Sequence, residues 1–99
     1  MGAKGYIVVL GAGESGVGAA CLAQAQGFDV FVSDFGVIAE QYKAELESLR
    51  IPFEENQHTE EKIVSADEVI KSPGIPEKAP IIKKLKEKGV SVISEIEFA

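Results

Sequence analysis

Short apolar runs alternate along the chain with segments in which apolar residues recur at helical spacing. Five runs have the length and composition of β-strands, and they comprise residues 6–10, 28–33, 51–55, 68–71 and 90–93. Helices are predicted between them, over residues 15–26, 39–49, 59–65 and 80–88. In the second helix Tyr42, Leu46 and Leu49 recur at spacings of four and three, so they form one apolar face. This alternation of strands and helices predicts a parallel α/β sheet.

Residues with special backbone preferences mark the ends of these elements. Gly27 and Gly89 each stand just past a helix, where a positive φ is common, and Pro80 suits the first helical position. Thr59 has the side chain of a helix N-cap. Pro52 lacks a backbone N–H, which places the third strand near a sheet edge. With right-handed crossovers and a glycine turn after the first strand, we expect a Rossmann-like open sheet of five parallel strands in the order 3-2-1-4-5, with helices on both faces.

Composition narrows the class of protein. The chain has 99 residues, of which 45% are hydrophobic, and this suits one domain over residues 1–99. No apolar run approaches the roughly 20 residues that span a membrane and no secretion leader is evident, so we expect a cytoplasmic protein.

The single cysteine, Cys21, cannot form an internal disulfide and is expected in the core. The formal net charge of −6 argues against nucleic acids and anionic membranes as partners, but it permits a small anion held by backbone N–H groups at a helix N-terminus.

A glycine-rich turn lies between the first strand and the first helix, with the sequence Gly11-Ala12-Gly13-Glu14-Ser15-Gly16. In such a turn the first glycine allows a tight bend, the second lets the backbone approach a pyrophosphate, and the third lets the helix pack on the strand. Asp34 ends the next apolar run, 18 positions beyond Gly16, where an acidic residue commonly meets the sugar or base of a nucleotide. The turn therefore predicts a nucleotide-phosphate site, with a turn that only packs as the alternative.

A second unusual loop, Ser72-Pro73-Gly74-Ile75-Pro76, follows the fourth strand. In the expected strand order the first and fourth strands flank the topological switch point, so both loops meet at one crevice. This convergence favours a ligand site at the carboxyl ends of these strands. A simple turn remains the alternative for Ser72 to Gly74.

The order of these motifs resembles the N-terminal domain of the Mur ligases, and within that family the members that add D-glutamate. The resemblance covers essentially the whole chain. Its most specific parts are the loop Ser72-Pro73-Gly74-Ile75 and the segment Glu95-Ile96-Glu97 after the last strand. It implies a cytoplasmic three-domain ligase of peptidoglycan-precursor synthesis, whose first domain holds the UDP part of UDP-N-acetylmuramoyl-L-alanine. ATP and Mg²⁺ would bind in the central domain, and the C-terminal domain would help to bind D-glutamate.

The chain contains no Gly-Lys-Thr or Gly-Lys-Ser motif, which the family uses to hold ATP. The resemblance therefore implies an N-terminal fragment with no catalytic residues and no cofactor of its own. Such a fragment would be inactive as a ligase without the central and C-terminal domains of its parent chain.

The same resemblance implies a UDP site formed by Gly11, Gly13, Glu14, Ser15, Gly16, Asp34, Phe35, Ser72, Pro73 and Gly74. The glycine turn would approach the diphosphate through the backbone of Glu14 and through the N–H and hydroxyl of Ser15, and the second loop would cover the pyrophosphate. Asp34 would meet the uracil or the ribose. The family often continues after this acid with a hydroxyl residue and an arginine, whereas Phe35-Gly36 follows here. We expect Phe35 to cover the face of the base.

Two other functions remain open from the residues alone. One is an NAD-binding or redox-sensing Rossmann domain, and the other is an interaction module that binds no nucleotide. His58, the only histidine, lies in a polar run and is expected in a solvated loop, without a nearby residue that would complete a metal site. The lysines of residues 83–88 are expected on a solvated helix face, and Glu95 and Glu97 at the surface.

Overall fold

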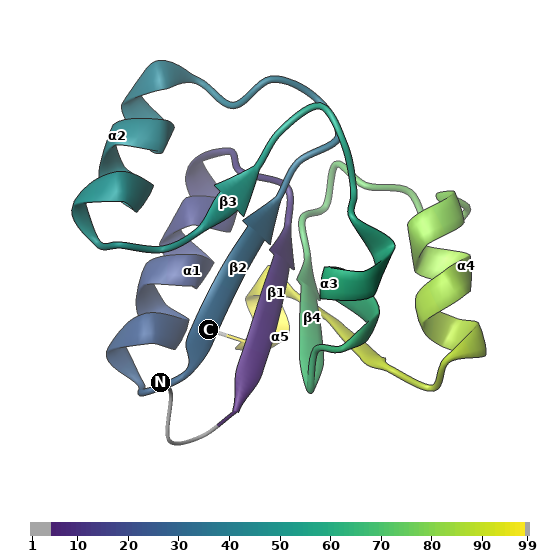
Figure 1. The fold of residues 1–99 in the computed structure, drawn as a ribbon. Helices are drawn as coiled ribbons and strands as arrows, with labels where there is room; N and C mark the ends of the chain where they lie inside the picture. Colours follow the sequence, from purple (N-terminus) through teal and green to yellow (C-terminus); the bar gives the residue numbers. More distant parts are fainter. Residues whose placement is uncertain (1–4, 99) are drawn as a thin grey trace.

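The computed structural model describes residues 5–98 and contains a five-stranded parallel sheet (Figure 1). The strands are β1 (Tyr6–Leu10), β2 (Asp29–Ser33), β3 (Phe53–Glu54), β4 (Glu68–Lys71) and β5 (Ser91–Ser94). The helices are α1 (Glu14–Ala25), α2 (Glu40–Ser48), α3 (Glu60–Val64), α4 (Pro80–Glu87) and α5 (Glu95–Phe98). The spatial order β3-β2-β1-β4-β5, with each neighbouring pair parallel, confirms the predicted topology.

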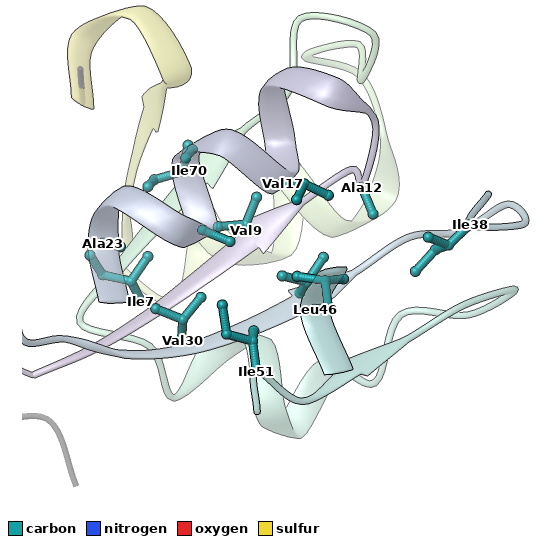
Figure 2. Close-up of a cluster of buried hydrophobic side chains, with 13 residues drawn as sticks. Ile7, Val9, Ala12, Val17, Ala23, Val30, Ile38, Leu46, Ile51 and Ile70 are labelled. Carbon is teal, nitrogen blue, oxygen red and sulfur yellow. The ribbon is translucent and has the colours of Figure 1, made fainter. Parts of the chain in front are cut away.

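Each face of the sheet has its own apolar cluster, because successive residues of a strand point to opposite faces. Ile7 and Val9 of β1 pack with residues of α1 and α2, as Figure 2 shows. Val8 and Leu10 pack on the other face with residues of α3 and α4. Helices therefore cover both faces, as predicted. The central strands are buried on both sides, which is the usual situation in a parallel sheet.

The strand β3 contains only two residues and lies at an edge of the sheet, as the proline beside it predicts. It is shorter than the apolar run over residues 51–55. The N–H of Ile51 donates to the carbonyl of Leu46 and so closes the end of α2 instead of joining the sheet. Pro52 has no N–H, and it takes part only through its carbonyl, which accepts from Val32.

The predicted helix ends are largely confirmed. Gly27 has a φ of 99° and Gly89 a φ of 75°, and Pro80 is the first residue of α4. Thr59 occupies the N-cap position of α3, but its side chain does not cap the helix. Its N–H and its hydroxyl both donate to the carboxylate of Glu54, so the predicted capping interaction is wrong.

The predicted surface positions are confirmed only in part. Glu95 was expected at the surface but is half-buried, and its Oε1 is buried without a hydrogen-bond partner among the described residues. Lys83 and Lys86 are exposed on α4 and Lys88 is exposed at its C-cap, while Lys84 is half-buried. Cys21 is half-buried rather than fully buried, and its Sγ lies 3.5 Å from the Oε2 of Glu45 on α2. None of the helices within residues 5–98 is both long and apolar enough to cross a membrane.

The apolar face predicted for α2 offers a test of the packing in Figure 2, since Leu46 is fully buried while Leu49 is 37% exposed. We expect Leu46→Ala to lower the free energy of unfolding by about 2–5 kcal/mol, because it leaves a cavity under the helix. Leu49→Ala is the matched control and should cost less than about 1 kcal/mol. Urea unfolding followed by circular dichroism measures both variants. Equal losses would contradict the described packing of α2.

Candidate functional site

The loops that follow β1, β2 and β4 meet at the carboxyl edge of the sheet, where a cavity of about 480 Å³ opens. The residues that line it include Gly11, Asp34, Phe35, His58, Gly74 and Ile75, together with the start of α4. Much of the lining is apolar, with a few polar groups, and both this character and the volume are typical of small-molecule sites. The predicted convergence of the two unusual loops at the switch point is therefore confirmed.

Two glycines of the turn are required by the fold itself. Gly11 has a φ of +98°, and a Cβ there would come within 2.7 Å of the Cβ of Ser72. A Cβ at Gly16 would lie 1.9 Å from the carbonyl oxygen of Gly11. Gly11 thus allows the bend and the close approach of the loop after β4. Gly16 allows α1 to pack directly on the turn, and both roles agree with the sequence interpretation.

Gly13 has no comparable structural reason to be a glycine. Its φ of −81° is ordinary, and a Cβ there would meet no atom within 4 Å. It is the N-cap of α1, and no side chain caps this helix, so the first N–H groups have no acceptor within the helix. Glu14 and Ser15 are exposed. The N-terminus of α1 is therefore open to an anion, which the exposed N–H groups and the helix dipole would attract.

The loop after β4 is built around Ser72, which packs against Gly11. Its N–H donates to the carbonyl of Leu10 over 3.0 Å, and its carbonyl accepts from the N–H of Ile75 over 3.0 Å. Lys71 Nζ donates to the carbonyl of Ile75 over 2.8 Å and so ties the loop to the strand. Within residues 5–98 the Ser72 hydroxyl has no hydrogen-bond partner, so it is available to a ligand. Gly74 is open, since a Cβ there would meet no atom within 4 Å.

Asp34 joins the loops that follow β1 and β2. Its Oδ2 accepts from the N–H of Ala12 over 2.9 Å, and its Oδ1 accepts from the N–H of Gly36 over 2.8 Å. These bonds hold the glycine turn in place from the neighbouring strand, a role that sequence reasoning missed. Each carboxylate oxygen can accept a second hydrogen bond. The contact of Asp34 with a sugar or base therefore stays a prediction.

His58 does not lie in a solvated loop, and that expectation is wrong. The side chain is half-buried in the cavity wall, and its Nδ1 lies 2.7 Å from the Oγ of Ser33. Its ring faces that of Phe35, with 5.5 Å between centroids and 37° between planes. Phe35 itself is 72% exposed. The sequence carries one trace of this arrangement, Ser33, which is a polar residue at a strand position where an apolar one is expected, but it does not identify His58 as the partner.

A polar network lies beneath His58. The Oγ of Ser33, which is fully buried, is 2.7 Å from the Oε2 of Glu54 and 3.2 Å from the carbonyl oxygen of Gln57. The same Oε2 accepts from the N–H of Thr59 over 2.7 Å. Residues from two strands and from the connection between β3 and α3 thus fix the position of the imidazole.

The network also sets the charges of its members. Burial acts to raise the pKa of Glu54, but the hydrogen bonds from Thr59 and Ser33 outweigh it and lower the pKa of this carboxyl. Burial lowers the pKa of His58, against the opposing influence of Glu54 and Asp34. Near pH 7 the network therefore contains an ionised glutamate and a neutral histidine.

Ser33, His58 and Glu54 are the residue types of a hydrolytic triad, but their arrangement excludes that function. In a triad the histidine stands between the serine and the acid, whereas here the serine stands between the other two. Ser33 is also fully buried and cannot reach a substrate. Among the described residues, no group of three or more His, Cys, Asp or Glu side chains is placed to hold a metal ion.

A parallel sheet with an open helix N-terminus and an apolar cavity at its switch point defines the Rossmann-like class of ligand-binding domains. A family model described as "Mur ligase MurD-like, N-terminal domain" matches residues 5–94. The chain belongs to this family.

Its relatives are considerably longer proteins. The UDP-N-acetylmuramoylalanine–D-glutamate ligase of Christiangramia forsetii is 61% identical over 99 residues, which cover 100% of this chain and 22% of that protein. The ligase of the same name from Porphyromonas gingivalis is 63% identical over 93 residues, which cover 94% of this chain and 21% of that one. The solved structure of a pseudomurein peptide ligase type C from Methanothermus fervidus matches 95% of this chain and 19% of its own, with a TM-score of 0.82 and 25% identity. The chain thus spans about a fifth of the length of the curated relatives.

The charges of the network predict how stability depends on pH. Because the pKa of His58 is lowered in the folded protein, the unfolded chain binds this proton more readily, and stability falls as the pH drops through about 6.5. The lowered pKa of Glu54 acts in the same direction at more acidic pH, because the unfolded carboxyl is protonated first. We expect the free energy of unfolding to decrease between pH 7.5 and about 5.5, and His58→Asn to flatten that part of the profile. Urea unfolding at a series of pH values measures it, and parallel profiles for both proteins would contradict this assignment.

Proposed function

We propose that this chain binds the UDP moiety of UDP-N-acetylmuramoyl-L-alanine, as the N-terminal domain of a D-glutamate ligase of peptidoglycan synthesis. The observation that carries the proposal is the open N-terminus of α1 beside an apolar cavity with an exposed aromatic ring. A diphosphate suits the helix N-terminus, and a nucleobase suits the apolar cavity with its aromatic ring. The names of the relatives supply the identity of the nucleotide sugar.

Within this site the diphosphate lies against the glycine turn. Gly13 leaves room for it, the backbone N–H groups of Glu14 and Ser15 donate to it, and the hydroxyl of Ser72 adds a donor from the facing loop. The carboxylate of Glu14 is exposed and turns toward solvent, since close to a diphosphate it would be repelled. Pro73 and Gly74 give the second loop its shape and its clearance over the pyrophosphate.

The nucleoside occupies the cavity. Phe35 covers one face of the base, and Asp34 has a free lone pair on each oxygen for a ribose hydroxyl or the base. The alternative ligand is NAD, which uses the same kind of glycine turn. UDP is favoured because the relatives act on a uridine nucleotide by name and because the second loop adds a polar group that a simple dinucleotide site does not require.

In the parent protein, ATP and Mg²⁺ belong to the central domain. The 99 residues contain no Gly-Lys-Thr or Gly-Lys-Ser motif, and residues 5–98 include no cluster of metal ligands, so this chain does not fit Mg²⁺-ATP and no phosphoryl-transfer step is assigned to it. Its partners are the central and C-terminal domains of the same parent chain. A ligase that acts on a nucleotide-activated precursor is expected in the cytoplasm, and the net charge of −6 suits neither nucleic acid nor an anionic membrane as a partner.

Parallel calorimetric titrations with UDP-N-acetylmuramoyl-L-alanine, UDP and NAD test the proposal. The two uridine ligands are expected to bind and NAD to bind at least about tenfold more weakly. Preferential binding of NAD would replace the proposed ligand by the alternative.

Gly13 provides a mutational test, because a side chain there meets nothing in the protein. Gly13→Val is expected to abolish UDP binding, since its methyl groups enter the space assigned to the pyrophosphate, while the fold persists. Gly18→Val is the matched control, because Gly18 is an exposed glycine of α1 whose Cβ would also meet nothing. Calorimetry with circular dichroism separates binding from folding. Unchanged affinity in folded Gly13→Val would remove the turn from the site.

Phe35 tests the position of the base. Phe35→Ala is expected to weaken UDP and CDP by similar amounts, about 1–3 kcal/mol, because stacking reads the face of a base and not its edge. Val37→Ala is the control, since Val37 is an equally exposed apolar residue of the same loop, at 75%, that does not line the cavity. A loss of the same size in both variants would indicate a general effect of the loop.

A further inference from the structure

The hydrogen bonds around Ser33 determine which nitrogen of His58 carries its proton. The Ser33 hydroxyl has one proton and three neighbours within hydrogen-bond distance, namely the Oε2 of Glu54, the carbonyl oxygen of Gln57 and the Nδ1 of His58. An ionised carboxylate and a carbonyl can only accept. The Nδ1 of His58 is the one neighbour that can donate.

The single proton of Ser33 goes to Glu54. That contact is 2.7 Å long, against 3.2 Å for Gln57, and its acceptor is charged. If Ser33 donated to His58 instead, the lone pairs of Oγ would face those of the carboxylate at 2.7 Å, which is repulsive. Ser33 therefore accepts from His58, and the 2.7 Å contact is an Nδ1–H donor to Oγ.

A neutral imidazole has only one N–H, so the opposite nitrogen, Nε2, is a bare acceptor. Burial lowers the pKa of His58 and keeps the ring neutral near pH 7. Among residues 5–98 no group donates a hydrogen bond to Nε2, although the side chain lines the cavity. The site thus presents an oriented acceptor, held by a buried network, next to the Phe35 ring 5.5 Å away.

We propose that the Nε2 of His58 accepts a hydrogen bond from the ring N–H of the uracil base and thereby selects uracil over cytosine. The inference rests on the proposed UDP site and assigns its base specificity. Uracil has a donor at N3, whereas cytosine in the same pose would place a lone pair against the lone pair of Nε2. Each oxygen of Asp34 already accepts one backbone N–H, and its remaining lone pairs suit a ribose hydroxyl. The Nε2 of His58, by contrast, has no partner among the described residues, and the network fixes the orientation of its ring.

The tautomer can be tested without a ligand. His58 is the only histidine of the chain, so its ring nitrogens are identified without ambiguity in a ¹⁵N–¹H correlation spectrum. We expect a protonated Nδ1 and an unprotonated Nε2 at pH 7.5, and loss of this preference in Ser33→Ala. A protonated Nε2 in the wild-type chain would overturn the inference whether or not UDP binds.

Binding tests the specificity. Calorimetric titrations of the wild type are expected to show that UDP binds at least about tenfold more tightly than N3-methyl-UDP and CDP, which lack the ring N–H donor. In His58→Asn the amide N–H replaces Nδ1–H toward Ser33, but no atom stands at Nε2. The preference should then fall to within about threefold, through weaker binding of UDP.

The outcomes separate this inference from the proposed function. No binding of UDP at all would overturn both. Binding of UDP without preference over N3-methyl-UDP would overturn the inference alone. The inference would also be overturned if His58→Asn kept the preference for UDP. It would likewise be overturned if the variant lost the preference because N3-methyl-UDP bound more tightly, since the methyl group would then act by a steric clash with His58.

Discussion

The direct contact of α1 with the turn after β1 is the constraint on which the site depends. A Cβ at Gly16 would lie 1.9 Å from the carbonyl of Gly11, so the helix packs closer than any side chain permits. This contact brings the first turn of α1 to the carboxyl edge of the sheet, beside the cavity. Gly11 in turn allows Ser72 to pack against it, and Asp34 holds Ala12 from the neighbouring strand. The helix N-terminus and both loops are therefore positioned by close backbone packing together with the side chains of Asp34 and Ser72, which belong to the candidate site themselves.

This division explains how a chain with a net charge of −6 can present an anion site. In the proposed site the attraction would come from the N–H groups and the dipole of α1, which act within about one helical turn and need no positive side chain. The lysine-rich helix α4 does not supply the missing charge, because it lines the cavity through Pro80 and Ile81 and not through its lysines. A short-range site of this kind selects a ligand by geometry more than by long-range steering.

The elements that sequence alone predicts are those governed by local preferences. Backbone preferences predict the helix ends at Gly27, Gly89 and Pro80, and the structure confirms them. Topology predicts the strand order, and the backbone conformation of the turn predicts the roles of Gly11 and Gly16; the structure agrees with both. His58 could not be placed in this way, because its partner Ser33 lies 25 positions away. In the sequence His58 stands in a polar run, and only the pairing of β2 with β3 brings it next to the buried hydroxyl of Ser33. The bonds of Asp34 were missed for the same reason, since Ala12 lies 22 positions away.

The presence of a serine at position 33 is not explained by the stability of the fold alone. Ser33 is fully buried at the end of β2, where an apolar side chain would pack without any need for partners. Its hydroxyl is tolerated there because it donates to Glu54 and accepts from His58. Loss of Glu54 would remove its charged acceptor, and loss of His58 would remove its donor. A network of this kind adds little net stability, but it holds each member in one orientation. The orientation reaches the cavity through the imidazole ring, so a buried serine, with no access to solvent, sets the hydrogen-bonding character of the cavity wall.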